Sequence, residues 1–197
     1  DFEFGTPVGD YFADSAITGL GTNVFVNCYS LESIKLPQNL TSIGSNTFKM
    51  FPNNSEDFQS MLNTIRLPDS VISIGSYSFS GCSSLANCLL NEGLESIGSA
   101  SFENCSSLSH FIIPSTVSTI LPNAFKGCSG LRYIEFLGDN PGDFSGSLSA
   151  FTTSNYNLLP VIFVKTSAEG WLEKWSGRYT KTKAAVSVIA LTREDEE

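Results

Sequence analysis

A seven-residue phrase recurs along this chain at a fixed interval. Residues 79–85 read FSGCSSL, residues 102–108 read FENCSSL and residues 125–131 read FKGCSGL. The phenylalanines that open these phrases belong to a longer series with intervals of 23, 31, 23 and 23 residues: Phe25, Phe48, Phe79, Phe102 and Phe125. The interval of 31 is one repeat of 23 with an eight-residue insertion. A repeat of this length is typical of solenoids, in which each unit, here called a coil, stacks on the next.

The whole repeat follows the consensus L-x-x-I-x-L-P-x-x-V-x-x-I-G-x-x-x-F-x-x-C. Its first part alternates in steps of two, which indicates a short strand, and the proline ends that strand. V-x-x-I-G indicates a second short extended segment, and F-x-x-C-x-x-L has the three-residue spacing of a 3₁₀ or short helical turn. One coil cannot bury its apolar side chains alone, so stability must come from stacking. The sequence therefore predicts a β-rich repeat solenoid with short parallel strands and a buried phenylalanine ladder, with rungs about 4.8 Å apart.

Four cysteines occupy one column of the repeat, while Cys88 lies in the isoleucine column. The four are Cys28, Cys82, Cys105 and Cys128. Zinc sites use C-x₂-C pairs, and the chain contains none. Disulfides between neighbouring coils are within reach, but stacked side chains point in parallel rather than at each other, which disfavours bridging. We therefore predict buried free thiols in this column and a core position for Cys88.

The phrases LPDSVISIGSYSFSGCSSLANC and IPSTVSTILPNAFKGCSGLRYI resemble the BspA-like leucine-rich repeats of microbial surface proteins. The resemblance covers residues 14–138. Two departures from the family pattern are visible: Asn91 stands in the proline slot, and Leu121 with Pro122 stands where glycine is usual. The resemblance implies a right-handed leucine-rich-repeat solenoid, secretion or display on the cell surface, and adhesion to host proteins or other cells. Family members are generally not enzymes.

Three regions are expected along the chain. Residues 1–13 form an N-terminal segment, either an artificial junction or an end cap, and residues 14–138 form the repeats with the insertion at 49–60. Residues 139–197 are expected to form a C-terminal cap and an acidic tail. In this cap, "LLPVIFVKTSAEGWLEKW" resembles the terminal strand and helix that close such arrays. A capping box at Thr166 and Glu169 begins a predicted helix whose apolar face packs on the last coil through Trp171, Leu172 and Trp175.

Composition and motifs exclude several function classes. The net charge is −9 with no basic run, so the positive footprint that a nucleic-acid partner requires is missing. No apolar run reaches the length of a membrane span. His110 is the only histidine, and neither a nucleophile elbow nor a glycine-rich phosphate loop is present. The carboxylates fall in different register positions, which does not suggest an acid–base pair. No catalytic, cofactor or metal site is therefore predicted.

The predicted strand L-x-x-I-x-L turns its apolar residues inward, so the intervening residues face outward in two columns. In leucine-rich repeats generally this sheet lines the concave face, and its floor here would be Ser33, Lys35, Thr64, Arg66, Asn87, Leu89, His110, Ile112, Tyr133 and Glu135. Leu89 and Ile112, beside Tyr133 and His110, form an exposed apolar strip with charged ends, a pattern that favours protein binding. The alternative is that these aliphatic side chains only pack on each other along the ladder.

The insertion is a second candidate site, because loops on rigid scaffolds often carry function. Met50, Phe51 and Phe58 either project as an adhesive finger or tuck under the coil. From these observations we predict a non-enzymatic protein-interaction or adhesion module of a microbial cell-surface or secreted protein. The expected partner is a protein, such as a host matrix or cell-surface protein. The alternative function is a structural stalk that spaces another domain.

Overall fold

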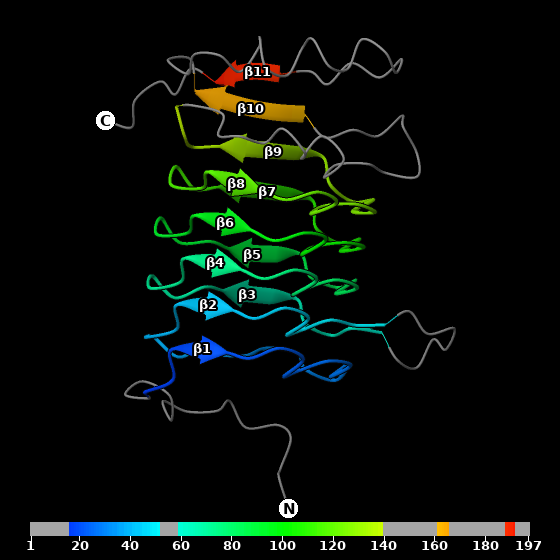
Figure 1. Cartoon of the computed structure of the whole chain (residues 1–197). Helices are drawn as coiled ribbons and strands as arrows, with labels where there is room; N and C mark the ends of the chain where they lie inside the picture. The colour runs from blue at the N-terminus through cyan, green and yellow to red at the C-terminus, as the bar shows by residue number, and fades with distance from the viewer. Residues whose placement is uncertain (1–15, 52–58, 140–160, 166–187, 192–197) are drawn as a thin grey trace, which may run out of the picture.

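The structure is a computed structural model that describes residues 16–51, 59–139, 161–165 and 188–191. These residues form a parallel β-solenoid in which short strands stack one above another (Figure 1). The strands are β1 (Gly19–Leu20), β2 (Ser42–Ile43), β3 (Thr64–Arg66), β4 (Ser73–Ile74), β5 (Asn87–Leu89), β6 (Ser96–Ile97), β7 (His110–Ile113), β8 (Thr119–Ile120), β9 (Tyr133–Phe136), β10 (Val161–Lys165) and β11 (Val188–Leu191). The described residues contain no helix. The predicted β-rich solenoid with short parallel strands is confirmed.

The strands lie on two sides of the stack. The V-x-x-I-G segments form one parallel sheet in the order β1-β2-β4-β6-β8. On the other side, the L-x-x-I-x-L segments form β3, β5, β7 and β9, in two parallel sheets, β3-β5 and β7-β9-β10-β11, and β10 and β11 extend the second of these. β5 and β7 are neighbours, but no strand ladder joins them. The core lies between the two sides, because each strand turns its isoleucine or equivalent residue inward.

In the V-x-x-I-G segments, the glycine that follows the strand is required because the backbones of neighbouring coils approach closely there. A Cβ atom on Gly75 would lie 2.7 Å from the Ser45 amide nitrogen, and one on Gly98 would lie 2.5 Å from the Gly75 carbonyl carbon. In the fourth coil Leu121 takes this slot with its side chain exposed to solvent. Its amide still donates to the Ile97 carbonyl at 2.9 Å, as the Gly98 amide does to the Ile74 carbonyl at 2.8 Å. The departure in the sequence therefore leaves the register unchanged.

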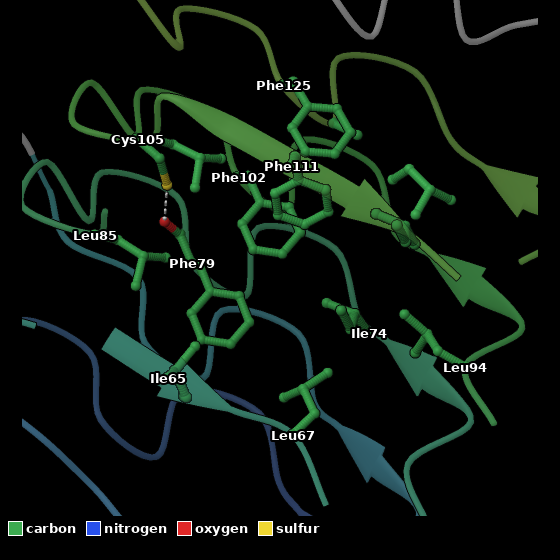
Figure 2. Close-up of a cluster of buried hydrophobic side chains, with 14 of the residues drawn as sticks. Ile65, Leu67, Ile74, Phe79, Leu85, Leu94, Phe102, Cys105, Phe111 and Phe125 are labelled. Carbon is green, nitrogen blue, oxygen red and sulfur yellow. Dashed lines mark hydrogen bonds between the residues drawn. The ribbon is translucent and has the colours of Figure 1, made fainter. Parts of the chain in front are cut away.

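The phenylalanines stack as a continuous internal ladder, as predicted. Ring centroids along Phe25, Phe48, Phe79, Phe102 and Phe125 are 5.1, 5.2, 5.3 and 5.5 Å apart, and successive rings are within 7° of parallel. Figure 2 shows three of these rings, with Phe111 beside them. The last four rings of the ladder are at most 1% exposed. The apolar area that they remove from water makes this ladder the centre of the core.

The F-x-x-C-x-x-L segments form turns with hydrogen bonds between residues three apart, and none of these turns extends into a helix among the described residues. The Cys82 amide donates to the Phe79 carbonyl at 3.1 Å, and the Cys105 amide donates to the Phe102 carbonyl at 3.2 Å. The residue before the cysteine has a left-handed backbone in several coils: φ is 79° at Gly81, 61° at Asn104 and 74° at Gly127. A left-handed residue ends a right-handed helical turn, so the segment does not continue as a helix. A second turn follows, in which the Leu85 amide donates to the Cys82 carbonyl at 3.1 Å.

Three of the four column cysteines are buried free thiols, as predicted: Cys82, Cys105 and Cys128. Each donates its thiol to the phenylalanine carbonyl of the preceding coil, as the Cys105 Sγ does to the Phe79 oxygen at 3.2 Å (Figure 2). Cys28 is also free but only partly buried. Cys88 packs against the core and is likewise partly buried.

The ends of the array differ in part from expectation. The repeat predicts a strand at residues 31–36, but these residues form none, although exposed and less exposed residues alternate there. The predicted terminal strand is present as β10, and β11 continues the sheet. Residues 1–13 and the predicted cap helix lie outside the described residues.

Candidate protein-interaction surface

Eight of the ten predicted surface residues lie on four strands of one side of the solenoid. Alternating burial along β3, β5, β7 and β9 turns the intervening side chains outward. The strand register brings residues of each column side by side: Thr64 pairs with Asn87, Arg66 with Leu89, His110 with Tyr133, and Ile112 with Glu135. Most are exposed, while His110 and Glu135 are half-buried. The remaining two predicted residues, Ser33 and Lys35, are exposed but lie outside any strand.

The centre of this side carries an apolar strip, made of Leu89, His110, Ile112, Tyr133 and Phe163. Leu89 is 50% exposed, Ile112 is 43% exposed and Tyr133 is 40% exposed. The rings of His110 and Tyr133 stack with centroids 5.5 Å apart, and the Phe163 ring meets Tyr133 edge-on at 5.7 Å. Packing along the ladder therefore covers only part of these side chains. The rest of their apolar surface faces solvent as a contiguous patch, which is the usual mark of an interaction site.

Sequence reasoning missed Phe163. It lies on β10, where the register pairs it with Glu135 as the next residue of the outward column. Phe163 follows Glu135 by 28 residues, so the period of 23 does not find it. The run VIFVK is a strand signal that alternates in steps of two with β-branched and aromatic residues. Aligning that run with the preceding strand would have placed Phe163 on this surface.

The described part of the insertion divides between core and surface. Met50 is 3% exposed and belongs to the core, whereas Phe51 is largely exposed. The Lys49 ammonium lies 4.8 Å from the Phe51 ring centroid and 4.4 Å from that of Tyr77. Two clefts open at the base of the insertion, one between Ser33 and Thr64 and the other beside Phe51. Phe58 lies outside the described residues, so the choice between a finger and a tucked loop applies to it alone.

The titratable groups of the described residues do not assemble into a reactive centre. Burial raises the pKa of the Cys82 and Cys128 thiols to about 12, and it also raises the pKa of Cys105. These thiols stay protonated at neutral pH, and metals bind thiolates. His110 Nδ1 lies 3.3 Å from the Oγ of its neighbour Ser109. Among the described residues, no three His, Cys, Asp or Glu side chains group as metal ligands would, and no helix could cross a membrane.

The stacked 23-residue coils and their parallel strands define a leucine-rich-repeat solenoid. A family model described as "BspA type Leucine rich repeat region" matches six copies over residues 10–66 and 54–157. This protein belongs to the BspA-type leucine-rich-repeat family. No protein with a curated description matches the sequence.

Solved structures show the same architecture. A leucine-rich repeat protein from Bacteroides ovatus is 31% identical with a TM-score of 0.54, and the match covers 78% of this chain and 39% of that one. The T. pallidum leucine-rich repeat protein is 26% identical with a TM-score of 0.58, and the match covers 88% and 81% of the two chains. The pneumococcal vaccine antigen PcpA shares the fold at 17% identity and a TM-score of 0.56, covering 82% and 42%. The chain thus spans about two fifths of the Bacteroides and pneumococcal chains.

Proposed function

We propose that this repeat array is a non-enzymatic protein-interaction module of a microbial cell-surface or secreted protein. Its binding surface is the apolar strip together with the flanking Arg66 and Glu135. The observation that carries the proposal is the exposure of Leu89, Ile112 and Tyr133 on the neighbouring strands β5, β7 and β9, on one side of the solenoid. Large aliphatic and aromatic side chains held in a fixed geometry are the anchors around which protein interfaces are built.

Three further observations support this function. Leucine-rich repeats generally bind proteins, and members of this family are generally not enzymes. The net charge of −9 favours a protein partner over nucleic acid. Members of the family are typically displayed on the surface of bacteria or secreted, where a host matrix protein or a protein of another cell is an accessible ligand. We propose adhesion to such a protein as the biological role.

The test replaces Leu89, Ile112 and Tyr133 together with serine. The variant is expected to lose binding to cells and to immobilised matrix proteins, because its apolar anchors are gone, while its circular dichroism spectrum stays unchanged. The matched control replaces three exposed apolar residues outside the strip with serine: Val24, Ile72 and Leu121. The control should retain binding. Binding that survives in the strip variant would favour the structural stalk or a site on the insertion.

A further inference from the structure

The spacing of the coils along the apolar strip is closer to the pitch of an α-helix than to the side-chain repeat of an extended strand. On this side neighbouring parallel strands lie about 4.8 Å apart, and the centroids of the His110 and Tyr133 rings, one coil apart, are separated by 5.5 Å. The internal phenylalanine ladder has the same spacing, between 5.1 and 5.5 Å per coil. An α-helix rises about 5.4 Å per turn, so a helix parallel to the solenoid axis presents one turn to each coil.

An extended partner does not match this spacing. Side chains on one face of a β-strand recur about every 6.8 Å, so a strand along the solenoid axis shifts by more than about 1 Å at every coil. The shift accumulates over successive coils, and the strand can seat only one or two side chains. A helix shifts by only about 0.6 Å per coil, so its positions i, i+4, i+7 and i+11 stay near successive rungs.

The chemistry of the outward column supplies a specific pattern for such a helix. The column runs through Arg66, Leu89, Ile112, Glu135 and Phe163, in the order in which β3, β5, β7, β9 and β10 stack (Figure 1). Arg66 is exposed at one end, and Glu135 is half-buried between Ile112 and Phe163. A complementary helix carries an acidic residue over Arg66, apolar residues over Leu89 and Ile112, a basic residue over Glu135 and an apolar residue over Phe163.

We propose that this surface binds an amphipathic α-helix of a partner protein, lying along the solenoid axis with one helical turn on each coil. Along the partner helix the contacting residues are acidic, apolar, apolar, basic and apolar at positions i, i+4, i+7, i+11 and i+14. The second outward column, which ends in His110 and Tyr133, flanks the helix on one side and fixes its lateral position. This proposal rests on the proposed protein-interaction function and names the partner's secondary structure and residue pattern.

The test uses a defined helical probe. An 18-residue alanine-based peptide carries Glu, Leu, Leu, Lys and Phe at positions 2, 6, 9, 13 and 16, and side-chain lactam bridges on its opposite face hold it helical. A second peptide of the same composition carries these residues at every second position without the bridges. Fluorescence anisotropy with the full chain is expected to show binding of the helical peptide at least about tenfold tighter than binding of the second peptide.

Three variants of the protein locate the bound helix. Ile112→Asp should abolish binding of the helical peptide, and the control Ile72→Asp, at a residue of similar exposure on the other side of the solenoid, should leave it unchanged. Arg66→Glu should weaken binding about tenfold, and a peptide with lysine in place of its glutamate should recover that loss, since the charge pair is restored with opposite sign.

Several outcomes would overturn the helix proposal. These are equal affinity for the two peptides, no binding of the helical peptide at millimolar concentration, or equal effects of Ile112→Asp and Ile72→Asp. The cell-binding experiment separates this failure from failure of the proposed function. If the triple serine variant loses cell binding while the helical peptide does not bind, the surface is functional and its partner is not a helix. If neither experiment responds to changes in the strip, the surface itself is wrong.

Discussion

At the scale of the residue, the cysteine column is explained by the carbonyl groups of the phenylalanine column. The Phe79 carbonyl accepts one hydrogen bond from the Cys82 amide of its own coil and another from the Cys105 thiol of the next. The Phe102 carbonyl is shared in the same way by Cys105 and Cys128. A thiol is apolar enough for the core and can still donate to the second lone pair of a buried carbonyl. The recurring F-x-x-C phrase thus links each coil to its neighbour.

Asn91, which departs from the family pattern, compensates for a second departure two residues later. In the coil below, the Ser70 Oγ lies 2.6 Å from the Gln38 carbonyl oxygen and 2.7 Å from the Leu40 carbonyl oxygen, so its single hydroxyl proton is shared between the two carbonyls. The equivalent residue one coil on is Gly93, which has no hydroxyl. The amide of Asn91 donates instead to the equivalent carbonyls, Asp69 at 3.0 Å and Val71 at 2.8 Å. The two departures therefore keep a side-chain donor at both equivalent carbonyls, with the two N–H groups of one amide in place of one shared hydroxyl.

This compensation predicts a non-additive pair of substitutions. Asn91→Pro alone, which restores the family residue, should lower the free energy of unfolding by about 1–3 kcal/mol, because two carbonyls lose their donor. Asn91→Pro with Gly93→Ser should recover most of that loss, since the serine hydroxyl reaches the same carbonyls. Urea denaturation of the two single variants and the double variant measures the coupling energy. Additive effects would show that the two positions act independently.

At the scale of the element, the rings of the phenylalanine ladder differ in how many other rings they contact and in how deeply they are buried. Phe102 lies between two parallel rings and also contacts the Phe111 ring edge-on at 4.9 Å. Phe25 contacts one described ring and is only partly buried. Phe111 occupies a column in which Ile34, Ile65 and Ile134 stand elsewhere, and its ring packs edge-on against both Phe102 and Phe125. The break in the strand ladder between β5 and β7 coincides with the change in this column from Cys88 to Phe111.

Replacing a ladder phenylalanine with alanine should therefore lower the free energy of unfolding more at the centre of the ladder than at its end. Phe102→Ala is expected to lower the free energy of unfolding by about 3–5 kcal/mol, because the surrounding rings cannot collapse into the cavity. Phe25→Ala should cost clearly less, because water already reaches part of that ring. Chemical denaturation followed by circular dichroism checks both variants. Equal costs at the two positions would mean that ring stacking does not carry the stability of the core.

The sequence predicts the elements that recur every 23 residues, and it does not predict those that depart from this period. The repeat predicts three features of the fold. These are the V-x-x-I-G strands β2, β4, β6 and β8, the buried phenylalanine rings, and the outward residues of β3, β5, β7 and β9. The missing strand at 31–36 does not follow from it, because strand formation needs hydrogen bonds from a neighbour in register. Phe163 was missed because its connection to Glu135 is longer than one period. The turns do not extend into helices because Gly81, Asn104 and Gly127 have left-handed backbones.

At the scale of the whole molecule, the solenoid is a one-dimensional stack in which each coil contacts mainly its neighbours. Backbone hydrogen bonds recur with the period, as from the Phe79 amide to the Ser101 carbonyl at 2.7 Å and from the Phe102 amide to the Ala124 carbonyl at 2.8 Å. Stability in such an array is a sum of coil terms and interface terms between neighbours. Whole coils are therefore expected to be removable units.

Deletion of one period should leave a folded protein. Removing residues 80–102 joins Phe79 to Glu103 and leaves every column in register, with the Phe79 carbonyl now facing the Cys128 thiol. The shortened chain should unfold cooperatively with a lower urea midpoint, because one coil and one interface are lost. The control removes residues 80–91, about half a period, which places apolar residues of one coil against polar residues of the next. Circular dichroism should show loss of cooperative unfolding only in the control. Equal behaviour would contradict stacking in register.

The repeat alone determined the class of fold, the buried ladder and the two outward columns, because stacking like residues over like requires only that the period be kept. The tertiary structure decided which carbonyl each thiol meets, how Asn91 replaces the hydroxyl missing at Gly93, and that Phe163 completes the apolar strip. These features depend on contacts between side chains one coil apart and on the register of strands joined by longer connections. A periodic pattern does not contain such distances, since it states which residues are equivalent and not how far their atoms reach.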